Sequence, residues 1–307
     1  MGLYRRRSHG RESGGEGLKM ATTHDKSVAE QPAPAARGDA SRTELRIPGR
    51  PGRLRRYEPI LIGVGSVLLF LIVWQAVASA RLVSPLFLPG PLDIVDAFVV
   101  LFAQGQIWND IWVSGQEVVY GYGLAVLIAL PLGLLMGWYR RLNYALDPFI
   151  SFFYSTPRVA LLPLLILWFG IGIWSKIAVV FLGSFFPIVI NTIAGVRNLD
   201  AGLIKTSRSF GATDAQIFRT VALPGSVPFI LAGLRLGVGH ALIGVVVGEL
   251  VAAQAGVGLM MAKAGATFQT AKVFAGLIIV AGTGIIITGI LQRIEGRFQA
   301  WKPQNNT

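Results

Sequence analysis

The sequence predicts an all-α membrane protein with six transmembrane helices. Only 14% of its 307 residues are charged and 53% are hydrophobic, whereas about a quarter of the residues in a soluble domain are charged. The apolar residues also gather into blocks of about 20, the length at which an α-helix crosses ~30 Å of hydrocarbon. The formal net charge of +12 does not indicate a nucleic-acid partner, because the basic residues lie in the N-terminal segment and between the apolar blocks.

Residues 1–56 form a separate segment, which we expect to be a disordered, basic, cytoplasmic tail. They hold 13 of the 28 Lys and Arg residues and have no aliphatic run that could offset the entropy lost on ordering. Polar sequence follows Arg5, Arg6 and Arg7, so we expect no cleaved signal peptide. The alternative is a basic arm that binds nucleic acid or anionic lipid. We prefer a solvated tail that helps to fix the topology.

Residues 57–300 form the predicted membrane domain, in which six apolar segments are long enough to span a bilayer. The first is interrupted only by Gln75, and the second ends at Trp138 and Tyr139, residues typical of the membrane interface. The expected spans are residues 60–80, 118–138, 148–169, 177–196, 229–252 and 273–291.

The distribution of positive charge tests this count, because cytoplasmic loops accumulate Lys and Arg. With the N-terminus inside, the outside segments carry only Arg81, Lys176, Lys263 and Lys272. The cytoplasmic segments carry the basic residues of the tail and Arg140, Arg141, Arg197, Lys205, Arg208, Arg219, Arg293, Arg297 and Lys302. An odd number of spans would place the last three on the wrong side. Six spans with both termini in the cytoplasm is therefore the expected topology.

The outside segment of residues 86–116 is too polar to span, yet it is not a simple loop. Ile94, Phe98, Leu101 and Phe102 recur at helical spacing. This pattern predicts an amphipathic helix that lies on the membrane surface or caps the bundle.

The cytoplasmic segment of residues 197–228 predicts a short, rigid helix outside the bilayer. Thr213 and Gln216 have the spacing of a capping box, Gly211 allows a sharp entry, and Pro224 is expected to end the helix. We expect this helix to expose Ile217 and Phe218, as a docking element for a partner would. The alternative is an ordinary helix that folds back on the bundle.

The same segment resembles the signature loop of permease subunits of binding-protein-dependent ABC importers. Gly211 is followed after nine residues by Val221-Ala222-Leu223-Pro224, although Lys205-Thr206-Ser207 stands where the family has Glu-Ala-Ala. Further residues resemble the nitrate, sulfonate and taurine branch, and the resemblance covers about residues 85–297. These residues are Leu88-Pro89-Gly90-Pro91, Thr156-Pro157-Arg158-Val159-Ala160-Leu161-Leu162-Pro163-Leu164, Trp168-Phe169-Gly170-Ile171-Gly172 and Gly233-Leu234-Arg235.

The resemblance implies a MetI-like bundle in the inner membrane, with several partners. These are a second permease copy, two cytoplasmic ATPase subunits that bind the ATP, and an external solute-binding protein. The implied ATPase contact comprises Gly211, Ala212, Thr213, Asp214, Ile217, Phe218, Arg219, Leu223 and Pro224. Within it, Ile217 and Phe218 are the expected apolar anchors and Arg219 the polar one.

Motifs for catalysis and cofactor binding are absent from the sequence. It contains no phosphate-binding Gly-x-x-x-x-Gly-Lys-Ser/Thr loop, no cysteine, and only three histidines, His9, His24 and His240. No cluster has metal-ligand spacing. The chain is therefore not expected to be an enzyme, to bind ATP or metal itself, or to carry a cofactor.

Three ionisable residues fall in the fifth span, where charge is costly and usually faces a bundle interior or an aqueous path. Arg235, His240 and Glu249 are candidates for lining a path that favours an anionic solute. Alternatively, Arg235 extends to the cytoplasmic surface, and Glu249 lies in the outer interface or pairs with a neighbouring helix.

Together these features predict the membrane subunit of an ATP-driven importer for a small anionic solute, such as a sulfonate, taurine or nitrate. The competing hypothesis is a secondary transporter or channel that works alone. Such proteins often contain inverted repeats with charged ion sites, and we find no convincing repeat here.

Overall fold

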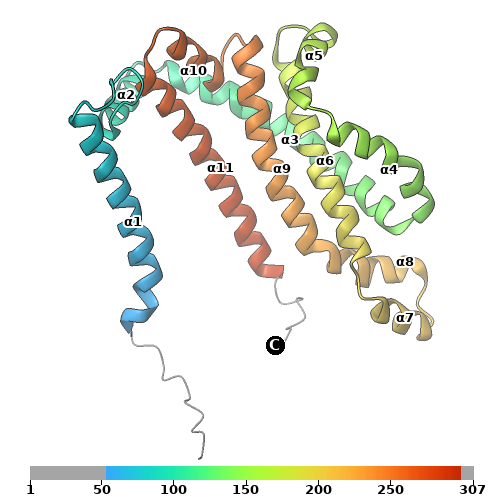
Figure 1. Cartoon of the computed structure of the whole chain (residues 1–307). Helices are drawn as coiled ribbons and strands as arrows, with labels where there is room; N and C mark the ends of the chain where they lie inside the picture. Colours follow the sequence, from blue (N-terminus) through green and yellow to red (C-terminus); the bar gives the residue numbers. More distant parts are fainter. Residues whose placement is uncertain (1–52, 299–307) are drawn as a thin grey trace, which may run out of the picture. The chain divides into compact units, whose positions relative to one another are not determined.

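The structure, a computed structural model, describes residues 53–298, and in this part the regular elements are all helical (Figure 1). The chain divides into two units, residues 1–56 and 57–307. The predicted disorder of the tail concerns mainly residues 1–52, which lie outside the described residues. The helices are α1 (Arg53–Ser79), α2 (Pro91–Ala103), α3 (Gln106–Trp138), α4 (Arg140–Ser155), η1 (Arg158–Leu161), α5 (Leu162–Phe169), α6 (Ile173–Arg197), α7 (Ala201–Ser209), α8 (Asp214–Ile217), η2 (Phe218–Ala222), α9 (Leu223–Ala252), α10 (Val257–Ala266) and α11 (Thr270–Phe298).

Five of these helical segments are long and apolar enough to cross a membrane. They begin at Ile60, Ile107, Ile173, Asp214 and Thr270, and they contain five of the six expected spans. The helix of the second span starts at Gln106, well before residue 118, and of the polar residues in this added part Glu117 is buried whereas Asn109 is exposed.

The third expected span, residues 148–169, is not one straight helix. Helix α4 and the η1–α5 segment meet at 89°, and they amount to a sixth span only when taken together (Figure 1). The break falls at Thr156, whose backbone is extended, with ψ of 130°. The reason is Pro157, because the ring of a proline disfavours the helical conformation of the residue before it.

The packed centre of the membrane unit consists of α3, α6 and α9, with α6 in contact with both of the others. Small residues let α3 approach α6 closely. A Cβ at Gly121 would lie 2.6 Å from Val180 Cβ, and one at Gly133 would lie 2.7 Å from Thr192 Cβ. Because lipid is as apolar as leucine, such close van der Waals packing is a main source of helix association in a membrane.

The predicted amphipathic helix between the first two spans is confirmed as α2. Its residues Ile94 and Leu101 are buried against Ala275 of α11, and Phe98 and Phe102 pack at the edge of the same cluster. The Trp74 indole N–H of α1 donates a hydrogen bond to the Pro89 carbonyl oxygen at 3.1 Å. Helix α2 therefore packs on the bundle through one apolar face.

Candidate coupling loop and translocation residues

The loop between α6 and α9 consists of two short helices joined by a tight turn. The Asp200 side chain caps α7 by accepting a hydrogen bond from the Gly202 backbone N–H at 2.6 Å. Gly211 has a φ of +78°, a conformation that glycine adopts at little cost, and it reverses the chain between α7 and α8. The exposed Arg208 and Asp214 side chains form an ion pair of 3.1 Å across this turn.

The predicted capping box at the start of α8 is confirmed. The Gln216 backbone N–H donates to Thr213 Oγ1 at 3.4 Å, and the Thr213 backbone N–H donates to Gln216 Oε1 at 2.8 Å. These two bonds satisfy donors that have no partner within the helix, so the entry into α8 is fixed.

The expectation that this helix exposes Ile217 is wrong. The Ile217 side chain is fully buried, and the half-buried Phe218 ring lies edge-on to Trp138, with ring centroids 5.4 Å apart. The exposed apolar side chains of the loop are instead Phe210, at 86% exposure, and Leu203, at 56%. Phe218 of η2 thus packs on the end of α3, and the exposed apolar surface of the loop comes from α7 and the turn.

Pro224 does not end the loop helix as expected. Residues Asp214–Ala252 form one continuous helical segment, in which η2 is a π-helical turn and Pro224 lies in the first turn of α9. The π-helical turn η2 directly precedes Pro224 and interrupts the regular i→i−4 bonds there, so the continuous segment accommodates a proline that has no N–H. Helix α8 is therefore joined directly to the membrane-spanning helix α9, so a force on α8 acts on α9.

Arg235, His240 and Glu249 do not meet in one site, although all three lie on α9. With 3.6 residues per turn, His240 points about 140° from Arg235 and about 180° from Glu249. Arg235 forms an ion pair with Glu295 of α11. It therefore ties α9 to α11, and each of the other two residues belongs to a different environment.

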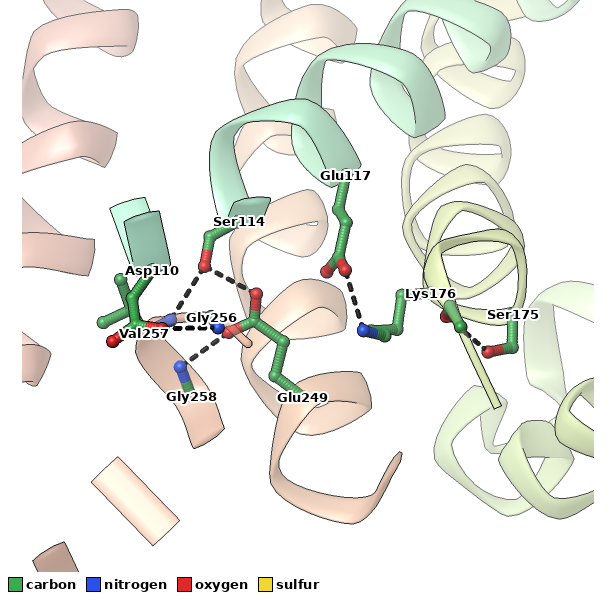
Figure 2. Close-up of polar contacts among 10 residues, drawn as sticks. Asp110, Ser114, Glu117, Ser175, Lys176, Glu249, Gly256, Val257 and Gly258 are labelled. Atoms are coloured by element: carbon green, nitrogen blue, oxygen red, sulfur yellow. Dashed lines mark hydrogen bonds and ion pairs between the residues drawn. The ribbon is translucent and has the colours of Figure 1, made fainter. Parts of the chain in front are cut away.

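Glu249 belongs to a buried polar network (Figure 2). Its carboxylate accepts hydrogen bonds from Ser114 Oγ of α3 at 2.5 Å and from the Gly258 backbone N–H of α10 at 2.6 Å. A Cβ at Gly256 would collide with this carboxylate, and Gly256 has a φ of +131°. The glycine therefore permits the close approach of the α9–α10 turn.

The same turn is fastened to α3 by two further bonds visible in Figure 2. The Gly256 backbone N–H donates to Asp110 Oδ1 at 3.0 Å, and the Val257 backbone N–H donates to Ser114 Oγ at 2.9 Å. The network thus joins the N-terminal part of α3, the C-terminal end of α9 and the start of α10.

Next to this network, Lys176 of α6 pairs with Glu117 of α3 at 2.9 Å (Figure 2). Lys176 was expected on the outside surface, but its side chain is only 4% exposed and that of Glu117 is fully buried. Sequence reasoning missed the pair because its members are 59 residues apart. The one available signal was an acidic residue next to an apolar run, which does not identify its partner.

The remaining residue, His240, lines a cavity of about 360 Å³ at the break between α4 and η1. The lining residues are Tyr154, Ser155, Thr156, Pro157, Arg158, Val159, Val179, Gly183, His240, Ile243, Gly244 and Val247. Arg158 lies here and donates a hydrogen bond to the Gly183 carbonyl oxygen at 3.1 Å. Irregular backbone at membrane depth is tolerated where it lines a water-filled cavity or is buried in protein. The break between α4 and η1 meets this condition, because it lies beside the cavity.

Within residues 53–298, no group of three or more His, Cys, Asp or Glu side chains is placed to hold a metal ion.

Residues 129–300 match the family described as the binding-protein-dependent transport system inner membrane component. The chain is 34% identical over 247 residues to the taurine transport system permease protein TauC of Escherichia coli, covering 79% of this chain and 90% of that protein. It is 36% identical over 253 residues to the putative aliphatic sulfonates transport permease protein SsuC of Bacillus subtilis, covering 82% and 91%. A probable ABC transporter permease protein of Brucella abortus is 40% identical over 215 residues, covering 70% and 86%.

Among solved structures, the fold is similar to a chain of the MetNI methionine ABC transporter in an inward-facing conformation. The TM-score is 0.50 at 22% sequence identity, covering 61% of this chain and 96% of that one. The described part of the chain thus has the MetI-like fold of importer permeases. The chain belongs to the family of inner-membrane components of binding-protein-dependent transport systems, and it is a multi-pass membrane permease rather than an enzyme.

Proposed function

We propose that the chain is the membrane subunit of an ATP-driven importer that translocates a small anionic solute of the sulfonate, taurine or nitrate class. An external binding protein delivers the solute, two cytoplasmic ATPase subunits bind the ATP, and a second copy of the chain completes the path. Both termini and the α7–α8 loop lie in the cytoplasm. The permeases named for taurine and aliphatic sulfonates support the choice of solute class.

The continuity of α8 with α9 is the observation that carries this proposal. A partner that holds the α7–α8 loop acts on α9 without an intervening hinge, because residues Asp214–Ala252 are helical throughout. Helix α9 in turn carries His240 at the cavity and Glu249 at the outer network. A displacement at the cytoplasmic end therefore reaches both regions as a rigid-body movement, one of the usual forms of switching transition.

The surface of the loop suits such a contact. Phe210 and Leu203 are exposed apolar side chains. The same loop exposes the basic residues Lys205, Arg208 and Arg219, of which Arg208 pairs with Asp214. An apolar centre with a polar rim is the usual anatomy of a protein interface. We expect the ATPase subunit to present an apolar groove with an acidic rim to this loop.

The test is to purify the tagged full-length chain from its native membrane and identify the proteins that accompany it. We expect an ATPase subunit in equal amount, and uptake of labelled taurine or ethanesulfonate by proteoliposomes of this complex only with ATP and the binding protein. A lone oligomer that transports without ATP would contradict the proposal and favour a secondary transporter.

A further inference from the structure

Arg158 is a half-buried basic side chain at the break between α4 and η1, and it differs from Lys176 and Arg235 in its partners. Lys176 faces Glu117 and Arg235 faces Glu295, but Arg158 forms no ion pair with any described residue. No Asp or Glu is among the residues that line its cavity. An intramembrane charge without a charged partner indicates a substrate or ion pathway.

The guanidinium group of Arg158 is held in a fixed position by its neighbours. One of its nitrogen atoms, Nη1, donates to the Gly183 carbonyl oxygen at 3.1 Å. Its Cζ atom lies 5.4 Å from the ring centroid of Tyr154 and 5.9 Å from that of Phe186. These contacts position the cation without neutralising it, so its remaining N–H donors are available to an acceptor in the cavity.

His240 adds a second polar group to the lining of the cavity. Its Nδ1 atom lies 2.9 Å from the Leu236 carbonyl oxygen, which only accepts hydrogen bonds, so Nδ1 carries the proton. In this tautomer the Nε2 atom can accept a hydrogen bond. The cavity thus offers the N–H groups of Arg158 to an anionic group of a solute. It also offers the Nε2 atom of His240 to an N–H or O–H group of the same solute.

The position of the cavity fits a translocation site. His240 is near the middle of α9 and Gly183 near the middle of α6, and discontinuous helices at such depth form the binding sites of many transporters. Its volume of about 360 Å³ is at the lower end of the roughly 300–1,000 Å³ of ligand pockets, which suits a small solute.

We propose that this cavity is a transient binding site for the sulfonate head group of the transported solute, with Arg158 as its charge partner and His240 as a second contact. The assignment rests on the proposed import function. It adds to that function a binding site and the residues that form it. It also explains a preference for sulfonates, because a planar guanidinium group binds two anion oxygens at once.

The first test uses the complete transporter in proteoliposomes with labelled ethanesulfonate as the probe. Arg158→Gln is expected to lower ATP-dependent uptake roughly ten- to a hundredfold, Arg158→Lys to restore part of it, and all variants to retain their ATPase subunit. The matched control is Arg141→Gln, which removes an exposed charge from the same α4 region and is expected to leave uptake unchanged. Normal uptake by Arg158→Gln would overturn the inference while leaving the importer function intact.

A second measurement does not depend on transport. Ethanesulfonate is expected to raise the unfolding temperature of the detergent-solubilised wild-type chain above the value in chloride of equal ionic strength, because a ligand stabilises the state that binds it. The shift should persist in Arg141→Gln and vanish in Arg158→Gln. If the wild-type chain shows no shift, the inference is wrong. If the complex transports nothing with ATP while the shift persists, the proposed function fails instead.

Discussion

Removal of Lys176 tests the buried ion pair between α3 and α6. Its ammonium group lies 2.9 Å from Glu117 Oε1, and the two side chains are 4% and 0% exposed. Methionine has a similar length and no charge, so Lys176→Met keeps most of the packing and leaves the Glu117 carboxylate without its cation. Breaking a buried pair in this way costs about 3–5 kcal/mol, because the remaining charge has lost its compensation.

The double variant Glu117→Leu/Lys176→Met separates this cost from a packing defect. Replacement of a whole buried pair by apolar residues of similar volume is often neutral or stabilising. We therefore expect the double variant to be close to the wild type in stability, which makes the interaction energy between the two sites at least about 3 kcal/mol.

The assay is thermal unfolding of the detergent-solubilised chain, followed by the fluorescence of its seven tryptophans. At about 2–4 °C per kcal/mol for a domain of this size, Lys176→Met should lower the unfolding temperature by roughly 6–20 °C. Arg208→Met is the control, because Arg208 forms an exposed ion pair with Asp214 and such pairs contribute less than about 1 kcal/mol. If Lys176→Met is as stable as the wild type, or if the double variant is as unstable as the two single changes added together, the reasoning is refuted.

Three further predictions concern the loop and the helix packing. Phe210→Asp should leave the unfolding temperature unchanged and reduce the amount of ATPase subunit that co-purifies, because the Phe210 ring is 86% exposed; full retention of the ATPase would place the contact elsewhere. Gly121→Val should destabilise the chain by about 1–3 kcal/mol through overpacking against Val180, whereas Gly123→Val, with no atom within 4 Å, should be tolerated in the same assay; equal effects would contradict the packing. Thr213→Ala should remove about 1 kcal/mol from the start of α8, seen as faster hydrogen exchange at Gln216, and unchanged exchange would show that the cap contributes little.

Much of the fold follows from the sequence because its signals are local. A block of 20 apolar residues is helical in a bilayer whatever surrounds it, since every backbone group must be satisfied within the segment. The capping box of Thr213 and Gln216 and the turn at Gly211 likewise depend on neighbouring residues only. The amphipathic helix α2 could be predicted for the same reason, because its apolar face repeats along a single segment.

Part of the break in the third span was predictable from its prolines. Pro157 forces Thr156 towards an extended backbone, and Pro163 suits the first turn of α5. The apolar composition of the segment is that of a single span, and composition does not show that the helix breaks at Thr156 and Pro157. Only the tertiary structure gives the 89° bend and the cavity beside it.

The partners of the buried polar groups could not be obtained from one sequence. Lys176 meets Glu117 and Glu249 meets Ser114 only because α3, α6 and α9 pack together, and Arg158 meets Gly183 only because η1 packs on α6. The contact of Phe218 with Trp138 at the end of α3 has the same origin. The sequence by itself determined where helices form and which are apolar enough to span a bilayer. Which faces of those helices meet, and therefore which charges are paired and which one faces a cavity, depends on long-range packing that no local pattern encodes.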